Sequence, residues 1–583
     1  MKNKRLFAVL LTGVMTAGIL AGCGSSSDSG SSAQDTSAAA TQAATEAAAE
    51  AETSAATEAG TETAATDSGE GGMASWEPFA ENVELKVPVY DRGVEGVPDV
   101  TDNYWTKWVQ SNFGDKYNIT VTYVPITRSD VMSDYAMLAA SDSLPTILSE
   151  FDYPKLAQWA TDGYLTTFDM DEFKTVAPTF YKAMEDNDLI KYSALDGDTY
   201  FCLAQNPYYE TNYNWEVFYR KDWLEKIGYD EYPTKWEDRK EMYQKLKDEG
   251  ICDYPLGGQM CTGLGADQNY AFRDYPQDEK TWAVYGNYTI PALGSEWNRR
   301  FLQRENEKYN LGFLDPEYYT IDTETAKANF VSGKTLEFGG YISANMDFIS
   351  AFYENNPDGE LAVLVSNDTV DDDGSVPFAF RSNNPFGVMS GFSSQATDDE
   401  IRAAWMYMEW LLQDDNLFTM QWGEEGENFN YDDKGLPVSV TDYDGDKKQG
   451  YSNNKDYWNL VMNIRTAGTI EDVIRQNTPA DVPYAEELTQ GVIDNFYAQQ
   501  KLAEEGYSVK DCLYATSIAA ESEYQETLIN DYKEFRDKIT MADPSDFDAT
   551  YDELSQDFAD DGWQEVVDER TAAYENGQTT KLD

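Results

Sequence analysis

The 583-residue sequence contains no histidine and only five cysteines. Without histidine, a Ser-His-Asp triad, a Cys-His nucleophile pair and most kinds of zinc site are excluded. Basic residues are also scarce, since 43 Lys and Arg stand against 106 Asp and Glu and give a net charge of −63. Nucleic acids and anionic lipids need clustered basic side chains, so neither is an expected partner. The charge also disfavours a strongly anionic ligand, unless its site is locally basic.

The first 22 residues have the layout of a secretory signal peptide. A short basic segment, residues 2–5, precedes an apolar stretch at 6–20 that is too short for a stable membrane span. It ends in Leu-Ala-Gly-Cys at residues 20–23, which resembles the bacterial lipobox. That resemblance implies that Cys23 is lipidated and anchors the protein to the membrane. The alternative is an ordinary secretory peptide with a chance cysteine.

The segment after Cys23 has almost nothing to bury. Residues 24–75 are almost only Ser, Ala, Thr, Gly, Glu and Asp, without an aromatic or basic side chain. Such a segment cannot offset the entropy lost on ordering. We therefore expect residues 23–80 to form a disordered acidic tether between the lipid anchor and the folded part.

The remaining chain is too long for a single hydrophobic core and suggests two or three lobes. Strand patterns alternate with helix patterns along its first part, which predicts a largely parallel α/β sheet. The expected strands are residues 83–90, 119–124, 146–148, 216–220 and 335–338. The expected helices are residues 101–113, 128–140, 153–161, 223–227, 236–249, 323–332 and a long one ending at 412, followed by C-terminal helices at 492–505, 521–540, 546–559 and 563–576.

Ligands of parallel sheets bind beyond the carboxyl ends of the strands. This rule places residues 90–92 and 149–151 on one wall of a possible ligand site.

Neither a phosphate-binding loop nor a metal motif is present in the sequence. The acidic turns at 371–374 and 442–446 lack the spacing of an EF-hand, so exposed turns are expected there. We expect no metal and no cofactor. Cys252 and Cys261 flank a Gly-rich loop and could form a disulfide in an exported protein, although free thiols are an equal alternative.

Four segments then resemble extracellular solute-binding proteins of ABC importers, the maltose-binding-like family 1. They are FYRKDWLEKIG at 218–228, YPTKWED at 232–238, ANFVSGKTLEFGGY at 328–341 and FGVM at 386–389. The sequence WGEEGENF at 422–429 and the helical C-terminal part are similar to the Gram-positive branch of oligosaccharide-binding lipoproteins.

The resemblance implies an α/β, two-lobe periplasmic-binding-protein fold (type II, flytrap) with a helical C-terminal tail. It divides the chain into lobe 1, residues 81–205 and 385–500, and lobe 2, residues 206–384 with the C-terminal helices at 501–583. It implies a monomer on the outer face of the cell membrane that binds a carbohydrate, an oligosaccharide, and passes it to ABC permease subunits, without enzymatic activity.

The resemblance also implies which residues bind the ligand. Tyr219, Tyr341 and Trp422 match aromatic positions of the family's sugar site, where a ring can cover the apolar face of a pyranose. The polar positions and the loop after the third strand are matched by Asp91, Arg92, Glu150 and Phe151. For each of these residues, ordinary packing or an exposed turn is the alternative.

Other functions fit the same sequence. The fold could carry a peptide or another polar solute, or the protein could be a surface interaction module without a small ligand. A lipid-anchored glycoside hydrolase with two carboxylates is a third alternative, because acidic residues are plentiful.

Overall fold

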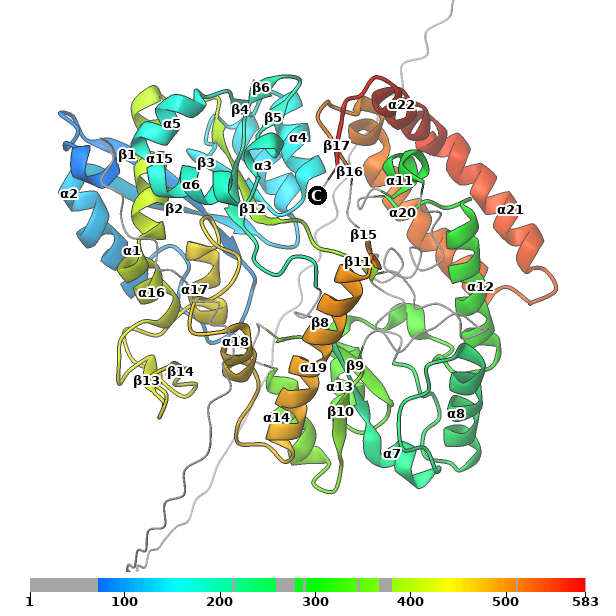
Figure 1. The fold of residues 1–583 in the computed structure, drawn as a ribbon. Helices are drawn as coiled ribbons and strands as arrows, with labels where there is room; N and C mark the ends of the chain where they lie inside the picture. Colours follow the sequence, from blue (N-terminus) through cyan, green and yellow to red (C-terminus); the bar gives the residue numbers. More distant parts are fainter. Residues whose placement is uncertain are drawn as a thin grey trace, which may run out of the picture. The chain divides into compact units, whose positions relative to one another are not determined.

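The computed structural model describes residues 72–211, 215–257, 278–286, 290–342, 346–365, 380–509 and 512–581 (Figure 1). In these residues, separate hydrophobic cores define three parts of the fold. We call them lobe 1 (residues 72–205 and 386–461), lobe 2 (described residues of 215–257, 313–365 and 470–504) and the helical block (α11, α12 and α20 to α22, defined below).

Lobe 1 begins with two parallel strands, β1 (Val83–Asp91) and β2 (Ile119–Thr127). Alternate residues of β1 enter the core, as the pattern of apolar residues predicted. The backbone N–H of Thr146 donates to the carbonyl oxygen of Lys86 on β1 at 2.9 Å, which brings the next strand beside this pair.

The second sheet of lobe 1 is centred on β12 (Phe386–Ser393), of which every residue is buried. It runs antiparallel to β3 (Ile147–Glu150), β4 (Leu165–Thr166) and β7 (Cys202–Gln205). The expectation of a largely parallel sheet is therefore wrong. β12 joins this sheet only after the chain has passed through lobe 2. Because its partner strands lie far away in the sequence, no local pattern shows whether β12 runs parallel or antiparallel to them.

The helices of lobe 1 bury an aromatic-rich core. Helix α15 (Asp398–Leu412) starts with a capping box of Thr397 and Glu400, and ten of its residues are buried. The Glu409 carboxylate on this helix accepts the N–H groups of Thr179 and Phe180, both at 3.0 Å, at the start of another helix. The other helices are α1 (Tyr104–Val109), α2 (Asp115–Tyr117), α3 (Val131–Ala140), α4 (Tyr153–Thr161), α5 (Met170–Val176), α6 (Pro178–Asp186), α16 (Asp414–Trp422) and α17 (Tyr451–Trp458).

Lobe 2 contains an antiparallel sheet with β8 (Trp215–Arg220) between β10 (Leu361–Val363) and β9 (Glu337–Tyr341). Consecutive strand residues point to opposite faces, so Phe218 joins one core and Tyr219 joins another on the other side of the sheet.

Helices cover both faces of the sheet in lobe 2. The helices are α7 (Lys221–Lys226), α8 (Trp236–Asp248), α13 (Thr323–Val331), α14 (Asp347–Asn355), α18 (Ile470–Asn477) and α19 (Ala485–Glu504). Ile474 of α18 and Phe496 of α19 lie in the same core as Phe218 of β8. Residues 470–500 thus pack with lobe 2, whereas the resemblance assigned them to lobe 1.

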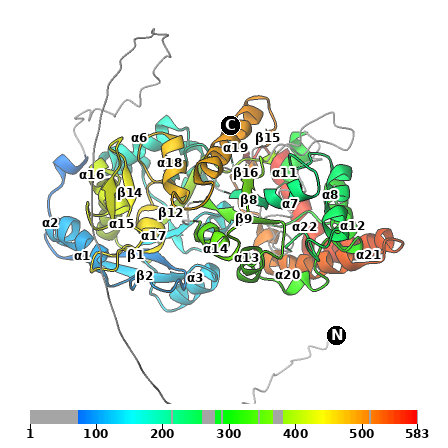
Figure 2. The ribbon, with the colours of Figure 1, turned by 90° about the horizontal axis from the view of Figure 1, so that it is seen from below.

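The helical block confirms the expected C-terminal helices and gathers at one side of the chain in both views (Figures 1 and 2). Its helices are α11 (Glu279–Tyr285), α12 (Glu296–Asn310), α20 (Ala519–Met541), α21 (Phe547–Phe558) and α22 (Gln564–Glu575). The fully buried Arg570 donates to Glu521 at 2.7 Å and to the carbonyl oxygen of Val284 at 3.1 Å. This buried pair connects α22 with α20 and α11.

The helical block also touches lobe 1. Strand β16 (Cys512–Tyr514) pairs with β17 (Thr579–Lys581), and Leu513 lies in the core of lobe 1 while Cys512 lies in that of the block. The Asp196 N–H donates to the carbonyl oxygen of Ala515 at 2.8 Å.

Three chain segments connect lobe 1 with lobe 2, and they lie side by side. The Asn206 N–H donates to the carbonyl oxygen of Pro385 at 3.1 Å, and that of Asn383 donates to Tyr209 at 2.9 Å. The third segment joins them because the Asn463 N–H donates to the carbonyl oxygen of Gln205 at 3.1 Å. These backbone bonds form the seam about which the lobes could hinge.

The remaining short strands are β5 (Ala194–Leu195), β6 (Asp198–Thr199), β11 (Phe380–Arg381), β13 (Phe429–Tyr431), β14 (Pro437–Ser439) and β15 (Ser508–Val509). Among the described residues, no helix has both the length and the apolar composition needed to cross a membrane.

Candidate binding site between the lobes

Aromatic and charged side chains from both lobes meet where β1 and β3 end. Lobe 1 contributes residues from β1, β2, β3 and α17, and lobe 2 contributes the first residue of β8 and the last of β9. We call this group the inter-lobe cluster: Tyr90, Arg92, Arg128, Glu150, Phe151, Trp215, Tyr341, Tyr451, Lys455 and Asp456.

Two aromatic rings and a guanidinium form one end of the cluster. Tyr90 and Phe151 stack with their ring centroids 6.3 Å apart. The Arg128 guanidinium carbon lies 5.0 Å from the Tyr90 centroid and 5.7 Å from that of Phe151. The backbone N–H of Arg128 donates to the Asp91 carbonyl oxygen at 2.9 Å, which fixes this residue just beyond β2. The arrangement is a cation–π stack at the carboxyl ends of neighbouring strands.

Glu150 lies under this stack and is 1% exposed. One carboxylate oxygen accepts the N–H of Phe151 at 2.7 Å and lies 4.0 Å from the Arg128 guanidinium. The other oxygen is buried and has no hydrogen-bond partner among the described residues. A carboxylate in this state orients Arg128 electrostatically.

Arg92 and Asp456 form a bidentate ion pair, with N···O distances of 2.8 and 2.7 Å. The Arg92 guanidinium also lies 4.5 Å from the ring centroid of Tyr451 and 5.6 Å from that of Tyr90. This pair joins the end of β1 to α17, two segments more than 350 residues apart in the sequence.

The first turn of α17 contains residues in the left-handed conformation. Ser452, Asn453 and Asn454 have φ values of 46°, 58° and 61°, a conformation that is uncommon for residues other than glycine. The Asn454 side chain compensates, since its oxygen accepts the Gly450 N–H at 2.7 Å and its nitrogen donates to the Met420 carbonyl at 3.1 Å. Strained backbone of this kind persists only where surrounding contacts hold it. In α17 it accompanies the placement of Tyr451, Lys455 and Asp456 in the inter-lobe cluster.

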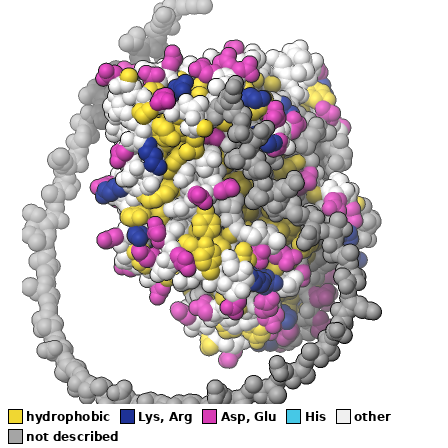
Figure 3. Space-filling model, turned by 60° about the vertical axis from the view of Figure 1, so that its left-hand side comes forward, with side chains coloured by type: hydrophobic (Ala, Val, Ile, Leu, Met, Phe, Trp, Pro, Cys, Tyr) yellow, Lys and Arg dark blue, Asp and Glu magenta, His cyan; other side chains and the backbone are white. Residues whose placement is uncertain are grey.

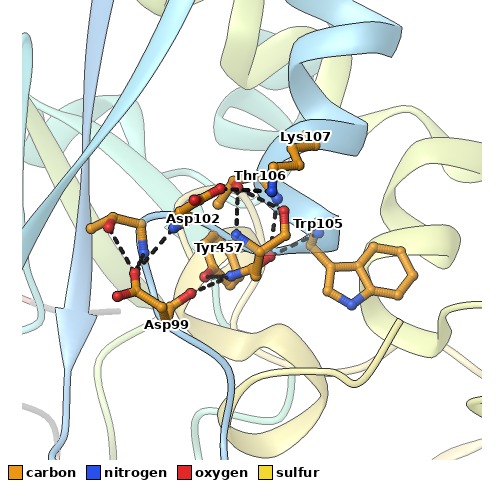
Figure 4. A network of polar contacts seen from close by, with 8 residues as sticks. Asp99, Asp102, Trp105, Thr106, Lys107 and Tyr457 are labelled. Carbon is orange, nitrogen blue, oxygen red and sulfur yellow. Dashed lines mark hydrogen bonds and ion pairs between the residues drawn. The ribbon is translucent and has the colours of Figure 1, made fainter. Parts of the chain in front are cut away.

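A network of hydrogen bonds fastens the other end of α17 to lobe 1 (Figure 4). The Tyr457 hydroxyl donates to the Val100 carbonyl oxygen at 2.7 Å and accepts from the Asn103 amide at 2.7 Å. Asn103 is also the N-cap of α1. A hollow of about 590 Å³ lies nearby, lined by residues that include Tyr104, Lys107 and Lys448. All of its lining residues belong to lobe 1, so it is not the predicted inter-lobe site.

Lobe 2 contributes Tyr341 and Trp215, which are opposite each other on β9 and β8. Their ring centroids are 5.1 Å apart, and Trp215 is 56% exposed. The Lys455 ammonium of lobe 1 donates to the Tyr341 hydroxyl at 2.9 Å. This is a direct polar contact between the lobes within the cluster.

The pKa values of Tyr90, Arg92 and Tyr451 are shifted in the cluster. Burial raises the pKa of the Tyr90 phenol well above its ordinary value, and the Glu150 carboxylate adds to this while Arg128 opposes it. Burial also raises the pKa of Tyr451, against the opposing effect of Arg92. For Arg92, burial lowers the pKa, but the bonds to Asp456 outweigh it and the net pKa is raised. The phenols are thus neutral hydrogen-bonding groups at physiological pH, and Arg92 stays charged.

Four of the seven predicted ligand residues lie in the cluster: Arg92, Glu150, Phe151 and Tyr341. Asp91 is exposed at the adjacent turn, and its carboxylate accepts the Gly93 N–H at 2.9 Å.

Tyr219 and Trp422 lie elsewhere, in hydrophobic cores. Tyr219 is 8% exposed and its ring contacts Tyr232 at 5.1 Å in lobe 2. Trp422 is fully buried, and its indole N–H donates to the Thr466 carbonyl oxygen at 3.3 Å. Neither reaches the cluster, because Tyr219 lies four residues further along β8 than Trp215 and packs in the core with Tyr232, and Trp422 is buried at the end of α16. We leave both out of the proposed site.

Six residues of the cluster were not among the predicted ligand residues: Tyr90, Arg128, Trp215, Tyr451, Lys455 and Asp456. The strand-end rule placed Tyr90 on the wall and, applied to β2, would have found Arg128. No sequence pattern predicted that the three residues of α17 lie in the cluster, because a left-handed turn of non-glycine residues cannot be recognised from the sequence.

The described residues contain no group of three metal-ligating side chains close enough to hold an ion. The acidic turn at 442–446 is described, and there Asp444 pairs with Lys448 at 2.7 Å. The turn at 371–374 lies outside the described residues. Cys202 and Cys252 are free thiols, and Cys261 also lies outside the described residues.

Solved structures share this fold over most of the chain. The alginate-binding protein AlgQ2, without calcium ion, superimposes with a TM-score of 0.57 at 15% identity, covering 85% of this chain and 99% of that one. A solute-binding protein from Bifidobacterium longum infantis, described as binding HMO and associated with an ABC transporter, gives 0.54 at 14% identity over the same shares. The S. pneumoniae substrate-binding protein FusA, in complex with kestose, gives 0.53 at 13% identity, again over 85% and 99%. At such identities the likeness concerns the fold.

The sequence comparisons give the family. No curated protein sequence matches the chain. The model for bacterial extracellular solute-binding proteins matches residues 98–417, more than half of the chain. This protein therefore belongs to the bacterial extracellular solute-binding proteins and has their two-lobe, type II fold.

Proposed function

We propose that this protein captures a carbohydrate, an oligosaccharide, at the inter-lobe cluster and delivers it to the permease of an ABC importer. The observation that carries the proposal is the meeting of aromatic rings and charged groups from both lobes at one place. Closure of two lobes on a ligand removes it from water and strengthens each polar contact inside.

The chemistry of the cluster suits a sugar. A pyranose has an apolar C–H face and a rim of hydroxyl groups. Trp215, with 56% of its surface exposed, offers a ring for the apolar face beside Tyr341. Guanidinium and carboxylate groups bind hydroxyl pairs through charge-assisted hydrogen bonds, and Arg92, Arg128 and Asp456 are of this kind. The descriptions of the structural neighbours, which name alginate, HMO and kestose, add support.

The family implies an extracytoplasmic location. We further infer that Cys23 carries the lipid anchor and that the protein acts as a monomer; Cys23 and the tether up to residue 71 lie outside the described residues. Residues 72–80, predicted as the end of the tether, instead pack on lobe 1, where Trp76 is buried and its indole N–H donates to the Val176 carbonyl oxygen at 3.2 Å. Metabolic labelling with an alkyne fatty acid tests the anchor. Label on the wild-type protein, and its loss with release into the medium for Cys23→Ala, would support it, whereas release of an unlabelled wild-type protein would contradict it.

A thermal-shift screen tests the ligand class. The Cys23→Ala chain is mixed with neutral and acidic oligosaccharides and, in parallel, with peptides. A ligand that binds only the native state raises the melting temperature by mass action. Stabilisation by oligosaccharides is the expected result. Stabilisation by peptides alone would reject the carbohydrate assignment.

A second assay addresses catalysis. Each stabilising oligosaccharide is incubated with the protein and the products are separated by chromatography. We expect the oligosaccharide to be recovered intact. Its cleavage with turnover would favour the glycoside hydrolase instead.

A further inference from the structure

The inter-lobe cluster has a charge balance unlike that of the chain. The whole protein carries more than twice as many acidic as basic residues, and acidic side chains are spread over the face in Figure 3. The cluster instead contains three cations, Arg92, Arg128 and Lys455, and two carboxylates, Glu150 and Asp456. A locally basic site is the condition under which an anionic ligand becomes compatible with such an acidic protein.

Both carboxylates of the cluster are already engaged. Asp456 uses both oxygens on Arg92, which neutralises that guanidinium. Glu150 accepts the Phe151 N–H and faces Arg128 at 4.0 Å. Neither forms an ion pair with Lys455.

Lys455 is a buried cation. The residue is 7% exposed, and among the described residues its ammonium donates one hydrogen bond, to the Tyr341 hydroxyl. Within the part of the chain that the structure describes, no carboxylate lies within ion-pair distance of it. Burying an unpaired ammonium is strongly unfavourable, so a partner from outside the chain would stabilise it.

Arg128 has unused donors. Its guanidinium rests on the rings of Tyr90 and Phe151, and its side chain is 36% exposed. No acceptor among the described residues forms a hydrogen bond with its side chain. A flat guanidinium held in this way matches the two oxygens of a carboxylate or of a sulfate ester.

We propose that the ligand is an acidic oligosaccharide, whose carboxylate or sulfate groups pair with Lys455 and Arg128. This inference rests on the proposed function and names the class of substrate within it. The net charge of the protein does not oppose such binding strongly, because at physiological salt exposed charges are screened beyond about 8 Å.

Matched ligand pairs test the inference by calorimetry on the Cys23→Ala chain. The first pair is an oligogalacturonate and its fully methyl-esterified form, which differ in charge. The second is a sulfated oligosaccharide and its desulfated form. We expect the acidic member of at least one pair to bind at least tenfold more tightly than its neutral partner. Its affinity should fall as salt rises, and the pair that responds shows which anion is bound.

Three variants link the charge preference to the site. Arg128→Gln and Lys455→Met should each remove most of the preference for the acidic ligand. Lys182→Gln is the matched control, since Lys182 pairs with Asp186 on the exposed surface of α6. Circular dichroism checks that each variant is folded, and the partly exposed Arg128 keeps the test available if Lys455→Met does not fold.

The outcomes separate the inference from the proposed function. Equal affinity for charged and neutral forms, or binding of neutral oligosaccharides alone, would overturn the acidic ligand and leave the carbohydrate function standing. A charge preference that persists in Arg128→Gln and in folded Lys455→Met would also overturn it. Failure to bind any oligosaccharide would count against both proposals.

Discussion

The Lys455 ammonium donates to the Tyr341 hydroxyl at 2.9 Å, and so joins α17 of lobe 1 to β9 of lobe 2. The same ammonium lies 5.2 Å from the centroid of the Tyr341 ring. A single tyrosine of the opposite lobe thus contacts a buried cation through both its hydroxyl and its ring.

Tyr341→Phe should destabilise the protein without removing the ring beside Trp215. The substitution leaves the Lys455 ammonium without its acceptor, which costs about 1–3 kcal/mol for a buried polar group. Urea unfolding followed by fluorescence measures the change. Tyr319→Phe, at a tyrosine that is 49% exposed, is the control and should change little. Equal stability of Tyr341→Phe and wild type would show that the contact contributes nothing.

Trp215→Ala should weaken ligand binding while leaving the fold intact. The residue is 56% exposed, so little packing is lost. The lost stacking on a sugar face corresponds to about 0.5–1.5 kcal/mol, or up to roughly tenfold in Kd. Calorimetry with any oligosaccharide found in the thermal-shift screen measures it. Tyr431→Ala, at a 49% exposed position on β13, is the control, and an equal loss in both variants would contradict a role for Trp215.

Arg92→Gln should be strongly destabilising. It leaves the Asp456 carboxylate, whose side chain is 7% exposed, without its bidentate partner. Breaking a buried ion pair from one side costs about 3–5 kcal/mol. The double variant Arg92→Gln with Asp456→Asn should recover part of this loss in urea unfolding. A control is Arg475→Gln, which removes the partner of the exposed Glu486. No recovery in the double variant would mean that packing, not charge, dominates.

Gly387→Ala should disturb the seam between the lobes. A methyl group at this position of β12 would lie 2.6 Å from the side chain of Asn463, which donates to Asn206 at 3.0 Å. Overpacking of this kind costs about 1–3 kcal/mol. Gly257→Ala is the control, because its nearest neighbours would be 3.7 Å away. Small-angle scattering with and without ligand would show whether closure changes too, and unaltered stability and closure would contradict the prediction.

The stability gained from Glu216→Gln should grow with pH. Burial raises the pKa of Glu216 well above its ordinary value, against the opposing hydrogen bond from Asn495 at 2.6 Å. In the unfolded chain the carboxyl ionises near its ordinary pKa, whereas in the folded protein it stays protonated. Its contribution to stability is therefore full below the unfolded pKa and falls as pH rises towards the folded pKa.

Melting temperatures at several pH values check this prediction. Glu216→Gln and wild type should differ least near pH 4, and the variant should gain on the wild type towards pH 8. Glu354→Gln, at an exposed position of α14, should show no such trend. A difference for Glu216→Gln that does not vary with pH would reject a raised pKa.

Local patterns predicted some of the strands and helices, among them β1, β8 and α15, and part of the inter-lobe cluster. The alternation in β1 and the capping residues Thr397 and Glu400 act between near neighbours, so they can be recognised in the sequence. Arg92 and Glu150 were predicted to lie on one wall because Arg92 follows β1 and Glu150 ends β3, and strand ends share an edge of the sheet. Helix α19 was predicted to start at 492 but begins at Ala485, where no N-cap side chain marks the start.

The sequence by itself determined the family, part of the strands and helices, the C-terminal helices α20 to α22 and the excess of acidic charge. All of these depend on residues close together in the chain or on composition. Only the tertiary structure decided that Tyr219 faces a core, that β12 runs antiparallel to its neighbours, and that α18 and α19 belong to lobe 2. It also brought Asp456 to Arg92 and Lys455 to Tyr341, because such contacts depend on how distant segments pack and on a left-handed turn that no local pattern encodes.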